Sequence, residues 1–394
     1  MAVTMLGSGP DVRLGPERWS NHQHRLGPLP TAAGLITVLE HSGVRGRGGA
    51  AFPVGRKWRS VADRQRGPAV VLANGAEGEP LSLKDRILLA ARPHLVIDGA
   101  LLAAGAVGAD RVVLYVGEEH DDAGRALVQA LAERGLGQRS RPAVELVAAP
   151  RGYVSGEESA AVHYLNEGVA LPTTRPPLPF QRGVDGLPTL VQNVETLAAV
   201  ALLARGTQAD TILITVGGAV AQPGVREVPA GTPLGEVVTQ AGGLTQSVQA
   251  VLFGGAAGAF MPAARAQATP LEAGTPGLGA GVVALLPSNH CGVAATAELL
   301  TSIAAFSAGQ CGPCRAGLPA IASSLRRLAG GQGDGHEVAR LRRWATMVDG
   351  RGACRHPDGA AGVLSSAIDT FAGDFRAHDR GYGCSVRVPR RRIA

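Results

Sequence analysis

Three short runs of small apolar residues, separated by helix-like segments, limit what the first half of this chain can fold into. The runs are "AVVLANG" from residue 69, "RVVLYVG" at 111–117 and "AVELVAAP" at 143–150. The segments between them, "SLKDRILLAARPHLVIDGALLAAGAVGA" and "EEHDDAGRALVQALAERGL", are mainly helical in pattern. Strands that alternate with helices favour an α/β layer with parallel strand pairing.

The pattern changes near residue 207. Short β-branched runs and a Gly/Pro-rich turn in "DTILITVGGAVAQPGVREVPAGTPLGEVVTQAGGL" predict a small α+β module, and "AATAELLTSIAAF" and "EVARLRRWATMV" predict later helices. We therefore expect a multidomain α/β protein with five parts: an irregular segment at 1–30, an α/β domain at 31–206, an α+β module at 207–280, a helical domain at 281–380 and a basic tail at 381–394.

Charge and composition argue against several classes of protein. The net charge of +6 comes almost entirely from arginine, and no recognition motif or aromatic stripe accompanies it, so we expect no nucleic-acid binding. The N-terminus lacks the pattern of a signal peptide, and the most apolar stretch, Leu95–Gly117, is interrupted by Asp98, Asp110 and Arg111. We expect a cytoplasmic chain with no membrane insertion of its own, which reaches a membrane only through partner subunits.

The stretch "FSAGQCGPCRAG" raises the main chemical question. Cys311 and Cys314 form a CxxC pair, and three of the five cysteines lie within 44 residues, which indicates metal or redox use. A thioredoxin-like dithiol would need a preceding strand, usually with a Trp, whereas the residues before Cys311 are helical in pattern. A zinc site would use Cys311, Cys314, Cys354 and His356. An iron–sulfur site is the third alternative.

A glycine-rich loop, "GVRGRGGAAFPVGRKW", is a candidate phosphate site. Gly46, Gly48 and Gly49 allow close backbone approach, and successive N–H groups in such a loop bind phosphate. Because 55 of 394 residues are glycine, the loop alone is weak evidence, and a flexible turn is the alternative. The chain has only two lysines, Lys57 here and Lys84 in the next loop, which suggests that a compact ammonium group is needed at these places.

Polar side chains follow the first predicted strand and the third. Asn74, Glu77, Glu79 and Asp85 lie in "NGAEGEPLSLKDR", where ligands of open α/β sheets bind. The paired acids of "GYVSGEES" are Glu157 and Glu158; they are candidate ligand-binding residues, and the alternative is that they only stabilise the start of a helix.

Five motifs in a fixed order resemble the NADH-oxidising FMN and iron–sulfur flavoprotein subunit of respiratory complex I, and its relatives in NAD-linked hydrogenases and formate dehydrogenases. The motifs are "RGRGGAAFP.GRKW", "N..EGEP...KDR", "GYVSGEES", "LPTLVQNVETL" and "GQCGPCR". The resemblance implies a Rossmann-like FMN-binding domain, a β-grasp (soluble-ligand-binding) module and a C-terminal helical bundle with a [4Fe–4S] cluster. It also implies NADH as the hydride donor, FMN as its acceptor and a partner iron–sulfur protein, ferredoxin-like or thioredoxin-like with a [2Fe–2S] cluster.

The resemblance carries roles to individual positions. The implied FMN phosphate loop comprises Gly46, Arg47, Gly48, Gly49 and Lys57, and the implied flavin and ribityl contacts are Asn74, Glu77, Glu158 and Asn193. The remaining implied cofactor-site residues are Phe52, Glu79 and Glu157, and the implied cluster ligands are Cys311, Cys314 and Cys354.

The sequence also departs from the family at specific positions. Ala76 stands where the family has an aspartate, and Gln192 stands where it has the first Asn of "NNVETL". Ser60 and Leu178 replace two of the three aromatic residues that stack on the bases of NADH in the family. Its first cluster cysteine is Ala308. The loss of two aromatic side chains that stack on the bases of NADH predicts weak NADH binding.

A site with only three cysteines leaves four possibilities for the cluster. One iron can lack a ligand from the chain, His356 or Cys384 can be the fourth ligand, the cluster can hold three irons, or the cluster can be lost. We expect an electron-transfer subunit of the NADH dehydrogenase type. The alternative is a non-catalytic paralogue that serves assembly.

Overall fold

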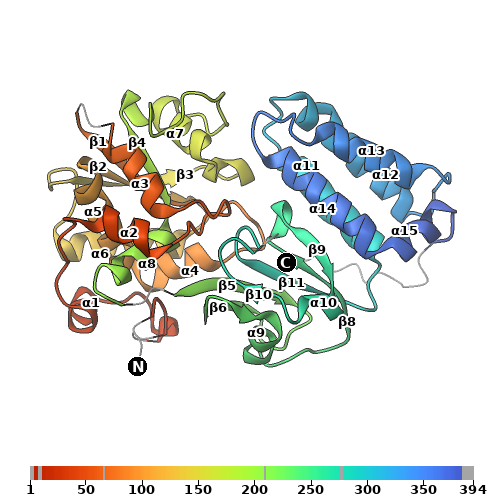
Figure 1. The fold of residues 1–394 in the computed structure, drawn as a ribbon, viewed down its shortest axis with the longest axis horizontal. Helices are drawn as coiled ribbons and strands as arrows, with labels where there is room; N and C mark the ends of the chain where they lie inside the picture. The colour runs from red at the N-terminus through yellow and green to blue at the C-terminus, as the bar shows by residue number, and fades with distance from the viewer. Residues whose placement is uncertain (1–3, 8–10, 65–66, 208–209, 276–277, 384–394) are drawn as a thin grey trace. The chain divides into compact units, whose positions relative to one another are not determined.

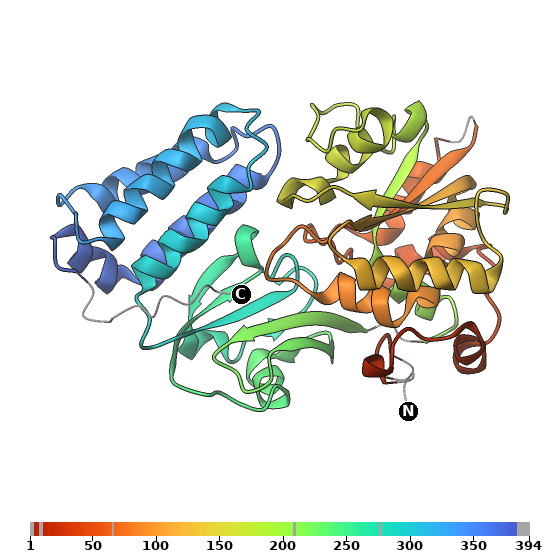
Figure 2. The same ribbon diagram turned by 180° about the vertical axis from the view of Figure 1, so that it is seen from behind.

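The chain folds into two compact units, shown in Figures 1 and 2. The computed structural model describes residues 4–7, 11–64, 67–207, 210–275 and 278–383. The first unit comprises Met1–Leu213 and Glu227–Ala230, and the second comprises Ile214–Arg226 and Gly231–Ala394. Each unit is described by itself below.

A four-stranded parallel sheet forms the centre of the first unit. Its strands are β1 (Ala69–Gly75), β2 (Ala109–Gly117), β3 (Ala143–Ala149) and β4 (Thr189–Asn193), in the order β3-β2-β1-β4. The predicted α/β layer with parallel pairing is confirmed. Strand β4 follows a long irregular segment and was not among the predicted runs. Because all strands run the same way, the carboxyl ends of the strands lie along one edge of the sheet.

Helices cover both faces of this sheet. On one face, α5 (Pro93–Val107) packs on β1 and β2, α8 (Val194–Leu203) on β1 and β4, and α6 (Asp121–Arg134) on β3. On the other face, α7 (Glu158–Glu167) contributes Ala161 and Val162 to an apolar cluster with alternate residues of β1 (Figure 1). Two covered faces explain why β1 is apolar throughout instead of alternating.

Four further helices complete the first unit: α1 (Trp19–Leu26), α2 (Leu35–Ser42), α3 (Val54–Ala62) and α4 (Lys84–Ala91). The prediction that 1–30 is irregular is wrong for α1. Buried His22 of α1 lies with its Nε2 2.9 Å from Asp98 of α5, and this polar contact fixes a helix that hydropathy alone did not indicate.

Among the described residues, no single helix is both long and apolar enough to cross a membrane. Helices α4 and α5 have the required length and composition only as a pair, and the chain bends by 98° between them, where Pro93 follows Arg92.

The second unit is built on a mixed five-stranded sheet in the order β6-β5-β11-β8-β9. Its strands are β5 (Thr211–Gly218), β6 (Gly224–Pro229), β8 (Val248–Phe253), β9 (Ala259–Pro262) and β11 (Val282–Pro287), with the short strands β7 (Thr232–Pro233) and β10 (Pro270–Leu271) paired separately. Two short helices, α9 (Leu234–Gln240) and α10 (Ala263–Ala266), join them. The boundary predicted at 280 falls before β11, which pairs with both β5 and β8, so 282–287 belongs to this sheet and not to the helical part.

The helical part of the second unit comprises α11 (Gly292–Ala305), α12 (Leu318–Ala329), α13 (Glu337–Val348), α14 (His356–Thr370) and α15 (Ala372–Asp379). A short π-helical turn, Pro313–Gly317, precedes α12. Helix α14 packs against β9, where the hydroxyl of Ser366 accepts a hydrogen bond from the Phe260 N–H at 3.0 Å. The predicted basic tail lies largely outside the described residues.

Two helical glycines give a matched test of this packing. A methyl group on Gly99 of α5 would lie 2.1 Å from the Leu197 carbonyl oxygen of α8, whereas one on Gly124 of α6 would meet nothing within 4 Å. We expect Gly99→Ala to lower the free energy of unfolding by about 1–3 kcal/mol and Gly124→Ala to raise it by about 0.4–1 kcal/mol. Urea denaturation of the three proteins measures both effects. Equal effects of the two substitutions would contradict close contact between α5 and α8.

Candidate functional site

The glycine-rich loop lies on the carboxyl end of β4. The Arg47 N–H donates to the Thr196 hydroxyl at 2.8 Å, and a Cβ on Gly48 would lie 3.3 Å from that of Asn193. Gly49 has a φ of 98°, which favours glycine. The Nε of Arg47 is buried and has no hydrogen-bond partner among the described residues. The loop therefore brings its backbone to the sheet edge, while the Arg47 guanidinium donates to the Thr211 carbonyl at 3.4 Å.

Helix α3 brings Lys57 to the same region. Its ammonium forms an ion pair with Glu158 at the start of α7, and both side chains are about one-third exposed. The next residue, Trp58, is buried and donates its indole N–H to Gln192 of β4 at 3.1 Å. Gln192 thus anchors α3 to the sheet, a role that the sequence did not indicate.

The loop after β1 is tied to the turn before α7. The side-chain amide of Asn74 donates to the Gly156 carbonyl at 2.7 Å. A Cβ on Gly78 would lie 2.3 Å from the Tyr153 carbonyl oxygen, so only glycine allows the two backbones to approach this closely. Glu79 is buried, and its carboxylate accepts the N–H of Leu81. These contacts hold the edge of the sheet together across β1 and β3.

Glu77 caps α4. Its carboxylate accepts the N–H of Asp85 at 3.0 Å, the N–H of Arg86 at 2.8 Å and the hydroxyl of Ser82 at 2.6 Å. Burial, and then the nearby carboxylate of Asp85, raise the pKa of Glu77 to about 7. Glu77 also has a φ of 37°, which is rare outside glycine, so the turn that places it is strained.

Asn193 and Glu157 are helix caps. The side-chain Oδ1 of Asn193 accepts the N–H groups of Glu195 and Thr196 at the start of α8, and the side-chain amide nitrogen donates to Asp85 at 2.7 Å. Glu157 accepts the N–H groups of Ser159 and Ala160 and pairs with Arg175. The helix-start alternative therefore fits Glu157, while its neighbour Glu158 faces Lys57.

Lys84 has a structural role. Its ammonium is buried, 2.7 Å from Asp85 and 2.8 Å from Glu195. Burial by itself would lower the pKa of Lys84, but the two carboxylates outweigh it and raise the pKa above the ordinary lysine value. A compact ammonium is thus used at Lys84, but its partners are carboxylates of the protein itself.

The positions expected to stack on NADH lie on neighbouring segments. Ser60 is near the end of α3 and donates its hydroxyl to the Arg56 carbonyl, and Leu178 is partly buried in the segment before β4. These segments meet where the guanidinium of Arg64 lies 4.9 Å from the ring centre of Phe180. Phe52 is half exposed.

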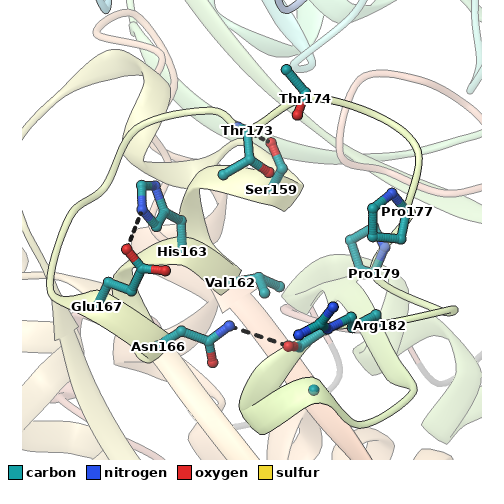
Figure 3. Close-up of a pocket in the computed structure, with 12 residues that line it drawn as sticks. Ser159, Val162, His163, Asn166, Glu167, Thr173, Thr174, Pro177, Pro179 and Arg182 are labelled. Atoms are coloured by element: carbon teal, nitrogen blue, oxygen red, sulfur yellow. Dashed lines mark hydrogen bonds and ion pairs between the residues drawn. The ribbon is translucent and has the colours of Figure 1, made fainter.

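A cavity of about 330 Å³ lies between α7 and the segment before β4 (Figure 3). Its lining residues include His163, Asn166 and Arg182, and Pro177 and Pro179, which flank Leu178, also line it. None of the predicted flavin-binding residues lines this cavity, so it adjoins the expected nicotinamide region and is separate from the glycine-rich loop.

The three candidate cluster cysteines come from two segments of the second unit. Cys314 is buried, and Cys311 and Cys354 are partly buried. Burial, followed by a hydrogen bond to Cys311, raises the pKa of Cys314 to about 12. Burial would also raise the pKa of Cys311, but the N–H groups of Ala353 and Cys314 outweigh it and lower that pKa. The amide of Ala353 therefore brings the Cys354 loop beside Cys311.

The structure argues against the zinc alternative. The His356 Nε2 donates to the Ile303 carbonyl at 2.8 Å, and burial lowers the pKa of His356, so this nitrogen is already used. Within the described ranges, no three His, Cys, Asp or Glu side chains come together closely enough to hold one metal ion. A cubane cluster is larger than an ion and needs its thiolates farther apart. Cys384, the other proposed ligand, lies outside the described residues.

Comparison with known proteins identifies the family. Residues 39–202 match the Nuo51 FMN-binding domain, 213–266 the SLBB domain and 294–378 the NADH-ubiquinone oxidoreductase-F iron-sulfur binding region. The chain is 33% identical to the F 2 subunit of the NADH-quinone oxidoreductase of Rhizobium meliloti, over 87% of this chain and 88% of that protein. The chain belongs to the family of NADH-quinone oxidoreductase F subunits.

Two further relatives agree with this membership. The F subunit of the NADH-quinone oxidoreductase of Streptomyces coelicolor is 30% identical over 98% of this chain and 95% of that protein. A chain of the NAD+-reducing [NiFe]-hydrogenase in the H2-reduced state is 30% identical, with a TM-score of 0.80 over 96% of this chain and 68% of that chain. The expected flavoprotein resemblance is confirmed.

The residues present fit FMN and, with one exception, an iron–sulfur cluster. The exposed backbone of Gly48 and Gly49 and the ammonium of Lys57 supply donors for a phosphate. The iron–sulfur binding region supplies three thiols, and Ala308 supplies none.

The raised pKa of Glu77 predicts a pH-dependent stability. The folded chain keeps the Glu77 proton to about pH 7 and the unfolded chain only to about 4.5, so the folded state loses stability as the pH rises between these values. Relative to Glu77→Gln, the free energy of unfolding of the wild type should fall by about 1–2 kcal/mol between pH 5 and pH 8, a value reduced for screening by solvent. Urea denaturation at the two pH values measures this loss. Glu236→Gln, at an exposed position, is the control, and parallel pH profiles of wild type and Glu77→Gln would contradict the prediction.

Proposed function

We propose that this chain is the electron-entry subunit of an NADH-oxidising complex, which binds FMN at the glycine-rich loop and an iron–sulfur cluster at Cys311, Cys314 and Cys354. The observation that carries the proposal is the loop itself, held on the carboxyl end of β4 by the contacts of Arg47 and Gly48 with α8 and Asn193. FMN, when bound, supplies the conversion of a two-electron hydride donor into single electrons.

The residues of the chain position and enclose this cofactor. The backbone of Gly46–Gly49 and the ammonium of Lys57 bind the phosphate. Asn74 and Asn193 hold the loop after β1 and the start of α8 in place through their own hydrogen bonds. Glu77 and Glu79 keep that loop ordered, and Glu158 orients Lys57. Phe52, half exposed beside the loop, offers an aromatic face to the donor.

The partner belongs to the same proposal. The names of the relatives describe subunits of multi-subunit oxidoreductases, so electrons leave this chain to a partner iron–sulfur subunit. We propose a ferredoxin-like or thioredoxin-like [2Fe–2S] protein for this role. The complex would lie in the cytoplasm and reach a membrane only through its partner subunits.

A purified, anaerobically handled sample tests the proposal. Flavin absorption that bleaches on addition of NADH supports it. A second candidate function, a non-catalytic assembly subunit, is favoured by the substitutions at Ser60, Ala76, Leu178 and Ala308. A colourless protein that still binds its partner subunits would support this second function and contradict the first.

Removal of Lys57 should weaken FMN binding. The variant Lys57→Ala loses one charge-assisted hydrogen bond to the phosphate, which is worth about 1.5–3 kcal/mol, or roughly a 10- to 150-fold rise in Kd. Flavin fluorescence titration measures it. Arg59→Ala is the matched control, because Arg59 is on the same helix but pairs with Glu40. If Lys57→Ala retains flavin as tightly as wild type does, the loop is not the phosphate site.

NADH oxidation should be slow in the wild type and restored in part by aromatic substitutions. Each lost stacking contact between a base and an aromatic ring costs about 1–3 kcal/mol of binding free energy. If the double variant Ser60→Phe and Leu178→Phe regains part of this free energy, the KM for NADH should fall by roughly 10- to 100-fold. Steady-state kinetics with ferricyanide as acceptor measures this. Asp63→Phe adds an aromatic ring at a nearby exposed position and serves as control. No gain in the double variant would show that these two positions do not limit NADH binding.

A further inference from the structure

Ala308 lies beside the cysteines of the iron–sulfur region. The N–H of Gly309, the next residue, donates to the sulfur of Cys314, and the N–H of Ala353 donates to the sulfur of Cys311. The two loops therefore converge, and Ala308 directly precedes Gly309, three residues before Cys311. A methyl group has no donor atom for iron.

The polar side chains near Cys354 are already engaged within the protein. The Nε2 of His356 donates to the Ile303 carbonyl at 2.8 Å. Asp358 accepts the Gly350 N–H at 2.8 Å and pairs with Arg355 at 2.9 Å. Cys291, at the start of α11, is buried and lies with its sulfur 3.4 Å from the Nε2 of His378. These three side chains, His356, Asp358 and Cys291, each have another partner within the described part of the chain.

The loop that carries Ala308 is open to solvent. A Cβ on Gly309 or on Gly312 would meet nothing within 4 Å, and Gln310 between them is exposed. Ala308 itself is partly exposed, so a small molecule from solution can reach this residue.

We propose that, in the bound [4Fe–4S] cluster, one iron takes its fourth ligand from outside the chain: a solvent-derived water or hydroxide that a small thiol can replace. This inference rests on the proposed function, because it takes the cluster to bind at Cys311, Cys314 and Cys354. Three thiolates hold three irons, and the fourth is held by the sulfides of the cluster and by an exchangeable ligand.

The lability of this iron follows from its ligand. Ferricyanide removes one electron from [4Fe–4S]2+ to give [4Fe–4S]3+ and ferrocyanide. The oxidised cluster releases Fe2+ and leaves [3Fe–4S]+, so charge and iron balance. A thiolate from the chain would retain the iron at this step, because it cannot diffuse away from the site.

The experiment uses the full chain, reconstituted anaerobically with iron, sulfide and FMN. The proteins compared are wild type, Ala308→Cys, the displaced-thiol control Ala305→Cys, and Cys384→Ser. After one equivalent of ferricyanide, we expect wild type, Ala305→Cys and Cys384→Ser to lose about one iron in four and to gain the three-iron paramagnetic signal. Ala308→Cys should keep its iron. A separate measurement adds β-mercaptoethanol to dithionite-reduced wild type, which should change its paramagnetic resonance spectrum, and Ala308→Cys should not respond.

Three results would overturn the inference. One is a wild-type cluster that keeps all its iron on oxidation and does not respond to the thiol. Another is a wild-type cluster that becomes labile only in Cys384→Ser, which would make Cys384 the fourth ligand. The third is absence of iron from all four proteins. FMN content, measured on the same samples, reports on the proposed function separately: flavin retained without iron would leave the FMN site standing while this inference fails.

Discussion

The buried ammonium of Lys84 joins the two helices that follow β1 and β4 in the chain, α4 and α8. It lies between Asp85 at the start of α4 and Glu195 at the start of α8, and the other oxygen of Asp85 accepts the amide of Asn193. A buried charge left without its partner costs about 3–5 kcal/mol, so these groups require one another. The starts of α4 and α8, and with them the ends of β1 and β4, are fixed by this network.

The network changes how the candidate site is understood. Asn74, Glu77 and Asn193, which the family resemblance implies as flavin contacts, all have hydrogen bonds within the protein. They shape the edge of the sheet before any cofactor binds. The groups that we propose to meet a ligand directly are the backbone of the glycine-rich loop and the ammonium of Lys57, which keeps further N–H donors beside its ion pair with Glu158. Preorganisation of this kind places donors without a reordering cost at binding.

The sequence predicts the parallel α/β layer because each of its first three strands is an apolar run that ends in a polar loop. It does not predict β4, since a five-residue strand after a Pro-rich segment has little pattern of its own. It also misses the tasks of Gln192 and Thr196, whose partners, Trp58 and Arg47, are more than 130 residues away in the chain. Helix α1 is missed for the same reason: ion pairs between distant residues hold it, and hydropathy does not report them.

The positions that depart from the family differ from those that agree with it in what the fold demands of them. At Gly78, in the shared EGEP motif, a Cβ would lie 2.3 Å from the Tyr153 carbonyl oxygen, so a substitution there disturbs the backbone. Ser60 and Ala308 are partly exposed and are not packed in the core. Ala76 is buried in the apolar cluster under α7, where an aspartate would need a polar partner of its own. Changes at Ser60 and Ala308 can therefore leave the scaffold intact, whereas a change at Ala76 or at Gln192, which holds Trp58 of α3, cannot.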